Sequence, residues 1–589
     1  MSRMGKFDVA RALREIAELL KMRGESQFKT RAYENASRAL EALDEERLTL
    51  LVDEGRLTEL PGVGDSIAGR ITDLHRTGTT KLLEELRGAL PPGFLELSRV
   101  PNLGPKKVDV LTRELGLTSL EALEAACRAG RVRGLKGFGE KTEQKILEGI
   151  AQLREKKTER ALLVDALAIG EPLVAHVRAA PGVARAELAG SLRRWKETVA
   201  DLDCVVGLAD GATVDGVMDH FCAYALVEAV ESRGDTKCTV RLAQAAGSMQ
   251  VDLRVVPDVD FATALHHFTG SKEHHVRLRG IARGLGLTIS EWGLYRLDEK
   301  GAATDEKVPI ATEAALYERL GLEYVPPELR ENVGEIELAE RRAIPKDLVD
   351  EGDLRGVVHC HTVFSDGRNT VEEMARAADA LGMEYLTITD HSPTAGYAGG
   401  VGLDRLKAQW DEIARVQELV KVRLLRGTES DILEDGALDY PDSVLEQLDV
   451  VIASVHNRYG LDGAKMTARL KRTMELPIYK IWGHPLGRLI NRREPFDCRV
   501  EEILDVLARG RGAVEVNGDP NRLDFEPRWL RAAAERGLDF VVSADAHSVA
   551  ALGYLRFGVH LARRAGLRRG QILNTRDADS FRATVRPAG

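Results

Sequence analysis

The sequence has few cysteines and no long apolar run. Its six cysteines are scattered among 589 residues without paired spacing, so the simplest compartment is a reducing cytoplasm. A transmembrane helix needs about 18 or more consecutive apolar residues, and the sequence contains no such stretch. The N-terminal segment MSRMGKFDVARALREIAELL has the pattern of an amphipathic helix rather than of a signal peptide. We therefore expect a cytoplasmic protein with no membrane partner.

The sequence also lacks an excess of positive charge. A formal net charge of −10 at pH 7 argues against a uniformly basic surface that coats nucleic acid. Contacts with phosphate would have to come from local patches or from backbone amides. The length of 589 residues predicts several domains.

Three aspartates occur in two short apolar runs. Asp201 and Asp203 precede the run Cys204–Val206, and Asp252 lies within MQVDLRVV. In a strand, side chains at i and i+2 share a face, and an unpaired carboxylate is costly to bury. Three clustered carboxylates suit two Mg²⁺ ions about 3.5–4 Å apart, which clamp the attacking and leaving oxygens of a phosphoryl transfer. The alternative interpretation is three solvated acids at strand ends.

With the upstream turn GSLRR, this arrangement resembles the nucleotidyltransferase palm of family-X DNA polymerases. The resemblance implies that Gly190, Ser191 and Arg194 grip the nucleotide triphosphate and that the three aspartates hold Mg²⁺ or Mn²⁺. Asp252 would accept the proton of the primer 3′-hydroxyl. A glycine lets the backbone approach the phosphates, while a hydroxyl and a guanidinium supply donors. Trp195 stands where the family usually has glycine.

The segment HFTGSKEHH is similar to the family's Tyr-Phe-Thr-Gly-Ser turn, which lies under the sugar and base of the nucleotide. His267 takes the place of the tyrosine, and His275 takes the place of an asparagine that contacts the base edge. The segment 276–297 resembles the family's thumb. These departures leave sugar discrimination and fidelity open. The remaining nucleotide contacts that the resemblance implies are Phe268, Gly270, Ser271, His275 and Arg279.

Three N-terminal segments repeat one pattern: an apolar residue, a glycine-containing turn and an amphipathic helix. They are residues 60–71, 100–111 and 135–147, and the pattern is that of helix-hairpin-helix modules. Backbone N–H groups of the turn and the positive end of the helix dipole can hold a DNA phosphate without reading bases. The alternative is three ordinary turns. The glycines that we expect at DNA are Gly62, Gly64, Gly104, Gly137 and Gly139.

In DNA polymerase beta, the domain with the first hairpin also cleaves 5′-deoxyribose phosphate through a Schiff-base lysine. The aligned position here is Arg70. An arginine stays protonated and cannot act as the amine nucleophile. We therefore expect this domain to bind DNA gaps without lyase chemistry.

The last 240 residues alternate apolar strand-like runs with helical patterns, which predicts a parallel α/β barrel-like fold. Nearly every apolar run ends in residues that bind metals. In such barrels the carboxyl ends of the strands converge on one face, so these residues would surround one cavity. A single histidine at a strand end is more often a hydrogen-bonded loop residue. The nine candidates are His359, His361, Asp366, His391, Glu429, His456, His484, Asp545 and His547.

This set resembles the motifs of the PHP (polymerase and histidinol phosphatase) domain. Nitrogen and oxygen ligands without thiolates suit Zn²⁺, Mn²⁺ or Fe²⁺, and the ligand number is enough for three ions that activate water against a phosphoester. Arg458, Arg488 and Arg492 are candidates to grip phosphate or DNA, with surface or barrel-rim arginine as the alternative. Glu515 and Asn517 end a further apolar run and are candidates to support the ligands.

The whole chain is similar to the bacterial family-X DNA polymerases that carry a C-terminal PHP domain and 3′–5′ exonuclease activity. The resemblance implies gap filling in base excision repair, trimming of 3′ ends and abasic-site cleavage. Gapped or nicked DNA and deoxynucleoside triphosphates would be the partners of a monomer. One alternative is a DNA-end-processing nuclease with a weakened polymerase site, and another is a non-catalytic scaffold for DNA ends.

The expected fold is multidomain, combining α+β and α/β parts. The expected domains are a helical DNA-end-binding domain (1–90), a second helix-hairpin-helix subdomain (91–160), a palm (161–262), a thumb (263–325), a linker (326–348) and a distorted (β/α) barrel PHP domain (349–589).

Overall fold

The computed structural model divides into two compact units, Met1–Arg160 and Ala161–Gly589. It describes residues 4, 6–23, 25–41, 45–60, 62–88, 97, 100, 103, 105–135, 137–140, 142–147, 149–150, 160–244 and 247–588. Within these ranges, no helix is both long enough and apolar enough to cross a membrane.

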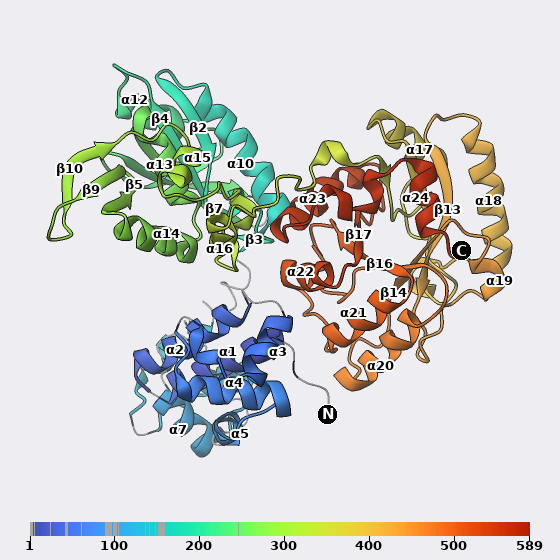
Figure 1. Ribbon diagram of the computed structural model, residues 1–589, viewed down its shortest axis with the longest axis horizontal. Coiled ribbons are helices and arrows are strands. Elements are labelled where there is room, and N and C mark those ends of the chain that lie inside the picture. Colours follow the sequence, from blue (N-terminus) through green and yellow to red (C-terminus); the bar gives the residue numbers. More distant parts are fainter. Residues whose placement is uncertain are drawn as a thin grey trace. The chain divides into compact units, whose positions relative to one another are not determined.

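The first unit is helical in its described parts (Figure 1). Its apolar residues form two separate clusters, one containing Leu13, Ile71 and Leu86 and the other containing Leu111 and Ile146. Two small hydrophobic cores therefore stabilise two helical bodies. The helices are α1 (Lys6–Met22), α2 (Gln27–Glu41), α3 (Glu45–Asp53), α4 (Asp65–Thr77), α5 (Lys81–Gly88), α7 (Pro105–Leu115) and α8 (Leu120–Arg128).

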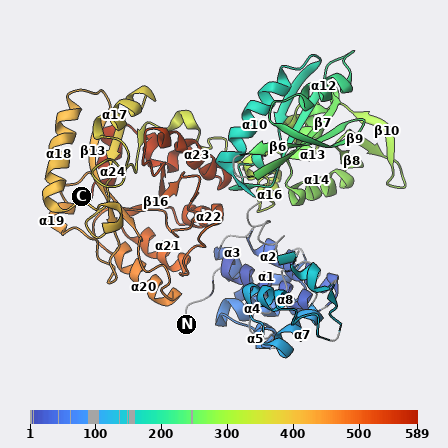
Figure 2. The ribbon, with the colours of Figure 1, turned by 180° about the vertical axis from the view of Figure 1, so that it is seen from behind.

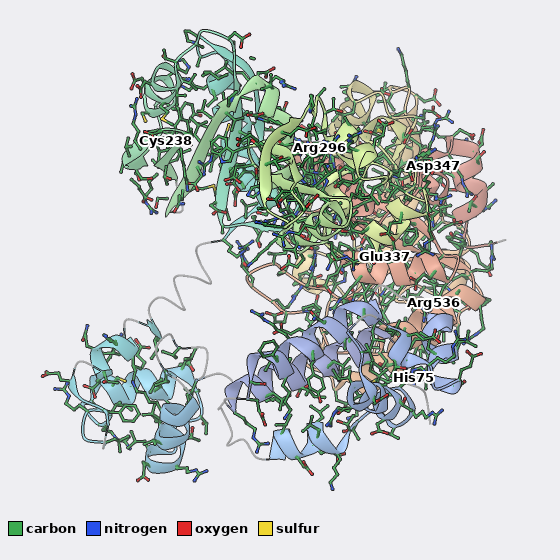
Figure 3. The ribbon with its side chains drawn as sticks, turned by 60° about the vertical axis from the view of Figure 1, so that its left-hand side comes forward. His75, Cys238, Arg296, Glu337, Asp347 and Arg536 are labelled. Atoms are coloured by element: carbon green, nitrogen blue, oxygen red, sulfur yellow. The ribbon has the colours of Figure 1, made fainter. Side chains whose placement is uncertain are left out.

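The second unit begins with a five-stranded sheet in the order β2-β4-β7-β6-β5. Only β4 and β7 run parallel to each other, and the other neighbours are antiparallel. Helix α10 (Leu163–Arg178) packs against β2, and α13 (Phe261–Thr269) packs against β4. Cys238, labelled in Figure 3, marks β6. The strands are β2 (Val183–Leu188), β4 (Asp201–Leu208), β5 (Val227–Arg233), β6 (Lys237–Gln244) and β7 (Gly247–Pro257).

A second body follows, built from α14 (Lys272–Gly284) and a three-stranded sheet in the order β10-β9-β8. Its apolar core includes Leu278, Leu316 and Val325. The segment 326–348, expected as a linker, adds Leu329 and Ile336 to that same core, so it is folded onto the thumb region. The other elements are β8 (Leu287–Ser290), β9 (Gly293–Leu297), β10 (Ala303–Val308), α15 (Glu313–Arg319), η3 (Pro327–Leu329) and α16 (Glu335–Glu340).

The C-terminal part contains seven parallel strands in sequence order, from β11 to β17. An isolated bridge between Cys360 and Ala546 connects the ends of the first and last strands, so the sheet is a nearly closed barrel. This confirms the predicted barrel-like fold. The strands are β11 (Gly356–Val357), β12 (Tyr385–Ile388), β13 (Arg423–Asp431), β14 (Val450–Ser454), β15 (Lys480–Trp482), β16 (Gly512–Asn517) and β17 (Asp539–Ser543).

Helices connect successive strands of the barrel and cover its outside (Figure 2). They bury amphipathic faces, as in α21, where Ile503, Leu504 and Leu507 point inward. A strand–helix–strand connection is the usual way to join parallel strands. The main helices are α17 (Val371–Ala380), α18 (Leu403–Gln417), α20 (Gly463–Met474), α21 (Val500–Arg509), α22 (Pro527–Glu535), α23 (Leu555–Arg564) and α24 (Ala578–Val585).

Candidate functional sites

The palm aspartates lie on the two parallel neighbours of the five-stranded sheet. The register of β4 and β7 sets Asp203 directly opposite Asp252, while Asp201 is one side-chain repeat before Asp203 on the same face. A small pocket is lined by Asp203, Asp252, Lys237, Arg254 and Phe268. The strand pairing therefore brings all three predicted carboxylates to one end of one sheet face.

The electrostatics of Asp203 reflect this crowding. Burial raises the pKa of Asp203 to about 7, and repulsion by the carboxylates of Asp201 and Asp252 adds to the effect. Carboxylates that lie close together repel one another, and this repulsion makes each of them harder to ionise. A divalent cation relieves the repulsion and takes the carboxylate oxygens as ligands. The residues present thus fit the divalent ions that the sequence predicts for this site.

Asp252 has partners that sequence reasoning missed. Lys237 of β6 places its Nζ 2.6 Å from Asp252 Oδ2, and Thr239 donates a hydrogen bond of 2.7 Å to Oδ1. Both partners come from the neighbouring antiparallel strand, whose residue Thr239 is the register partner of Asp252. Lys237 and Thr239 lie only 15 and 13 residues before Asp252, on the preceding strand. The periodicity within a single strand does not indicate this contact, because it depends on the register between β6 and β7.

The nucleotide-binding turn predicted at residues 190–194 follows β2 directly. Gly190 has φ +63°, and a Cβ at this position would collide with Asp203 Oδ2. Glycine is therefore needed both for its backbone conformation and for the close approach of the turn to the aspartates. Arg194 donates to the Thr269 carbonyl and pairs with Glu331 at 2.9 Å. Ser191 lies partly exposed in the same turn.

The segment 267–275 lies close to this turn. Gly270 has φ +68°, and a Cβ there would approach Arg194 Nη1 to 3.2 Å. Ser271 caps α14 by accepting a hydrogen bond from the His274 amide. Phe268 lines the same small pocket as Asp203 and Asp252, and the guanidinium carbon of Arg254 is 5.2 Å from its ring centroid.

His267 and His275 pack edge to face, with ring centroids 4.8 Å apart. Burial lowers the pKa of His275 to about 4, and repulsion from His267 and Arg279 adds to the effect. His275 is therefore neutral at physiological pH. Arg279 is exposed one helical turn further along α14. The structure thus places the predicted nucleotide-contacting residues near one another, around the end of α13 and the start of α14.

Two of the predicted helix-hairpin-helix glycines have left-handed backbone, Gly62 with φ +81° and Gly137 with φ +89°. Gly64 is the N-cap residue of α4. No described atom lies within 4 Å of where a Cβ would stand on Gly64, Gly137 or Gly139, so these turns have room for a backbone phosphate. Gly104 lies outside the described residues.

The nine predicted barrel ligands gather at the carboxyl ends of the strands. Glu429 of β13 is central: its carboxylate oxygens lie 3.0 Å from His391 Nδ1, 3.2 Å from His456 Nε2 and 2.8 Å from His484 Nε2. Asp545 Oδ1 is 3.4 Å from His361 Nε2 and 3.5 Å from His359 Nε2.

In three groupings, one donor atom of each residue lies within 4.8 Å of a donor atom of every other residue in the group. They are His361 with Asp366, His391 and His547; His359 with His361 and Asp545; and His391 with Glu429 and His456. The palm aspartates do not form so tight a group in the described residues, and Asp252 contacts Lys237 and Thr239.

Several barrel histidines bury ring nitrogens that have no hydrogen-bond partner in the described chain. These atoms are both nitrogens of His361, Nε2 of His359, Nδ1 of His391 and Nδ1 of His484. Three of these rings have a nitrogen 3.0–3.5 Å from a carboxylate of Glu429 or Asp545, but not in hydrogen-bonding geometry. Buried polar atoms are normally paired, so these open nitrogens fit metal ions. Burial lowers the pKa of His361 to about 3, helped by His547 and His391, and a neutral imidazole is the form that binds metals.

Backbone strain occurs at the same place. His359 has φ +67° and Asp545 has φ +48°, a conformation that residues with a Cβ rarely adopt and that clusters at functional sites. The fold therefore holds these two predicted ligands in their positions at an energetic cost.

Carboxylates behind the ligands fix the orientation of two histidine rings. Glu515 interacts with His359 Nδ1, and Asp431 interacts with His456 Nδ1. Such partners fix the tautomer of a metal-binding histidine and raise its basicity. The sequence indicated Glu515 and Asn517 as supporting residues, and Asn517 donates to Asp545 at 3.2 Å. It did not single out Asp431, although that residue ends the same run as Glu429.

Arg522 is another residue that sequence reasoning missed. Its Nε lies 3.2 Å from Asp545 Oδ2, and its Nη1 is buried without a partner among the described residues. Of the three arginines predicted to grip the substrate, Arg458 is exposed and pairs with Glu434, and Arg492 is exposed. Arg488 instead lies buried and pairs with Glu197 of the palm.

Comparison with known families assigns most of the chain. Residues 264–331 match the DNA polymerase beta thumb, and residues 358–519 match the PHP domain. Residues 4–80 match a helix-hairpin-helix domain, and residues 94–152 match a SAM-like helix-hairpin-helix tandem. The DNA polymerase/3′–5′ exonuclease PolX of Bacillus subtilis (strain 168) is 35% identical over 582 residues, which cover 98% of this chain and 99% of that protein. The chain belongs to the family-X DNA polymerases.

Two further relatives match only part of this family-X polymerase. DNA polymerase lambda of Rattus norvegicus is 26% identical over 293 residues, covering 46% of this chain and 48% of that protein. A probable phosphatase of Thermoanaerobacter sp. (strain X514) is 28% identical over 229 residues, covering 37% of this chain and 89% of that protein. The family-X chain thus joins helix-hairpin-helix, polymerase and PHP parts, as the motifs predicted.

Proposed function

We propose that this family-X polymerase fills short gaps in DNA and trims 3′ ends with its PHP domain. The observation that carries the polymerase activity is the register of β4 and β7, which sets Asp203 opposite Asp252 beside the turn at Gly190. The B. subtilis relative, which matches along the whole chain, is named for both a polymerase and a 3′–5′ exonuclease. Gapped DNA and deoxynucleoside triphosphates are the substrates that this arrangement fits.

In the palm, Asp201, Asp203 and Asp252 would hold Mg²⁺ or Mn²⁺, and the barrel ligands would hold three divalent ions drawn from Zn²⁺, Mn²⁺ and Fe²⁺. Bound ions would supply charge neutralisation and Lewis acidity towards phosphoryl oxygens. Ser191 and Arg194 would hold the triphosphate, so Arg194 must exchange its contact with Glu331 for phosphate. Asp252 would take the proton of the primer 3′-hydroxyl.

In the PHP domain, Glu429 and Asp545 lie between several histidines and are suited to bridge ions. Arg522 offers a buried guanidinium nitrogen to a phosphate oxygen beside Asp545, because bidentate or charge-assisted contacts make arginine the usual phosphate-binding residue. The helix-hairpin-helix turns at Gly62 and Gly137 would hold the DNA backbone. We further propose that the protein acts in base excision repair and cleaves abasic sites. It would do so as a monomer in the cytoplasm.

The second candidate is a DNA-end-processing nuclease with a weakened polymerase site. The contact of Lys237 with Asp252 favours it, because a lysine competes with a cation for the same carboxylate. The residues Trp195, His267 and His275 also depart from the family pattern.

Primer extension on a duplex with a one-nucleotide gap separates the two candidates. Wild type and His361→Ala should extend the primer with Mg²⁺ or Mn²⁺, and Asp203→Ala should not. On a 3′-labelled duplex, wild type and Asp203→Ala should release nucleotides, and His361→Ala should not. A folded wild type that degrades 3′ ends but never extends a primer would establish the nuclease. A duplex with one abasic site tests strand cleavage in the same assay.

A further inference from the structure

The nucleotide-binding turn contacts the PHP domain, which lies in the same compact unit of residues 161–589. Immediately after Arg194, the side chain of Trp195 stacks on His560 of α23, with ring centroids 3.5 Å apart and an interplanar angle of 6°. Arg556 places its guanidinium carbon 5.3 Å from the indole centroid, and the Phe557 ring meets the indole edge on. One helix of the PHP domain thus surrounds the residue that follows the triphosphate-binding arginine.

The backbone of Trp195 indicates that this contact holds the turn in place. Its φ is +54°, a left-handed conformation that glycine adopts freely and that a residue with a Cβ adopts only against a steric cost. The family usually has glycine at this position. The backbone strain at Trp195 must be offset by the contacts of its side chain. Stacked aromatic pairs contribute more stabilisation than the burial of their surface area alone.

Ion pairs form a second contact between the palm and the PHP domain, two residues after Trp195. Glu197 lies 3.1 Å from Arg564 of α23 and 3.6 Å from Arg488 of the barrel rim. Burial opposes the ionisation of Glu197, but Arg564 and Arg488 hold its pKa well below its usual range. The charged form is therefore the one that the interface stabilises.

The ring of His560 is itself held from two sides. Its Nδ1 lies 3.2 Å from Glu328 and its Nε2 lies 3.3 Å from Glu351. Glu328 also pairs with Arg563 at 2.7 Å. Three residues after Glu328, Glu331 pairs with Arg194. The same stretch of chain therefore contacts both the PHP helix and the arginine assigned to the triphosphate.

We propose that α23 of the PHP domain is a positioning element of the polymerase site, which holds the backbone of the turn Gly190–Arg194 in place for nucleotide binding through the stack of His560 on Trp195. His560 is a positioning residue, because it acts through Trp195. Its ion-pair partners, Glu328 and Glu351, are neither predicted nucleotide contacts nor predicted metal ligands. The inference rests on the proposed polymerase function. Its consequence is that a change confined to the PHP domain weakens nucleotide binding without affecting the exonuclease.

The test measures the equilibrium Kd of a deoxynucleoside triphosphate on the full-length chain bound to gapped DNA with a dideoxy-terminated primer, so that no chemistry is needed. His560→Ala should raise this Kd and the KM for nucleotide about three- to tenfold, as expected for the loss of one aromatic pair, with kcat and exonuclease rate within twofold. His560→Phe, which keeps a stacking ring, should restore most of the affinity.

The variant Trp195→Gly shows whether Trp195 anchors the nucleotide-binding turn or only strains its backbone. If Trp195 only strains the turn, glycine should bind nucleotide as well as or better than tryptophan. If it anchors the turn, glycine should bind more weakly, and His560→Ala should have little further effect in the double variant. His220→Ala is the matched control, because it removes another stacked histidine, 4.1 Å from His176 in the palm, and should leave the Kd unchanged.

An unchanged Kd in His560→Ala overturns the inference. A parallel loss of nucleotide binding, exonuclease rate and melting temperature, without recovery in His560→Phe, shows a purely structural role and overturns it as well. A wild type that binds no nucleotide at all refutes the polymerase function and with it this inference. If wild type binds nucleotide and His560→Ala and His560→Phe bind it with the same Kd as wild type, the inference is refuted and the polymerase function is not.

Discussion

Replacing Asp203 by asparagine should stabilise the palm when no divalent ion is present. The pKa of Asp203 is raised from 3.8 to about 7 by burial and by the neighbouring carboxylates of Asp201 and Asp252. Each pKa unit corresponds to 1.36 kcal/mol, so the ionised carboxylate costs about 4 kcal/mol. Relaxation and water at the strand ends reduce this to about 2 kcal/mol. Asparagine keeps the shape of the side chain and removes the charge.

The sign of the pH dependence follows from the direction of the shift. Because the pKa of Asp203 in the folded state is above its value in the unfolded chain, the destabilisation is absent below about pH 3.8 and complete above about pH 7. The advantage of Asp203→Asn over wild type should therefore be small near pH 4.5 and largest at pH 8.

Thermal melting of the full-length chain in chelator provides the assay. A gain of about 2 kcal/mol should raise the melting temperature of the palm transition by about 4–8 °C at pH 8, with slower hydrogen exchange of the β4 and β7 amides. Added Mg²⁺ should stabilise wild type and leave the variant nearly unchanged. Asp210→Asn, at an exposed position beyond β4, is the control. A variant no more stable than wild type in chelator at pH 8 would refute the reasoning.

Three further substitutions test other parts of the chain. Glu515→Gln should weaken divalent-ion binding in the PHP domain about 10- to 100-fold, because it weakens the contact that orients His359; metal titration of the exonuclease measures this. Glu313→Gln should cost about 3 kcal/mol of unfolding free energy, because buried Arg330 and Arg193 lose their shared carboxylate; denaturant unfolding measures this. Arg70→Lys should create a lysine that borohydride traps on 5′-deoxyribose phosphate.

Each of these predictions has an outcome that contradicts it. Metal affinity in Glu515→Gln equal to that of wild type would show that His359 needs no oriented tautomer. An unfolding free energy of Glu313→Gln within about 0.5 kcal/mol of wild type, the usual range of a surface substitution, would mean that the two arginines find other partners. Trapping by wild-type protein as strongly as by Arg70→Lys would place the lyase nucleophile elsewhere in the chain.

Local sequence patterns were sufficient for several features. The i, i+2 spacing of Asp201 and Asp203 predicts one strand face, because strand side chains alternate. Ligand-type residues that follow successive apolar runs predict one cavity, because parallel strands end on the same side of a barrel. The structure has the barrel, and it places His391, His456 and His484 around Glu429. These features depend on chain period and strand direction, which a sequence carries directly.

Other residues could not be assigned in this way. Lys237 reaches Asp252 only through the antiparallel pairing of β6 and β7. Arg522 reaches Asp545 from a loop that follows a different strand. Arg488 was a candidate to grip phosphate, with a barrel-rim arginine as the alternative, and it lies buried against Glu197, because its direction is set by packing between domains and not by its neighbours in sequence.

The chemical groups of this protein, and the strands and turns that present them, could be identified from the amino-acid sequence, because they depend on residue type and short-range periodicity. The surroundings of each group became known only from the folded chain. Trp195 shows the difference. Its sequence context indicated a departure from glycine near a triphosphate, whereas its stacking on His560, 365 positions further along the chain, follows from how the palm and the PHP barrel pack together. Contacts at such sequence separation are fixed by the complementarity of folded surfaces, which no local pattern encodes.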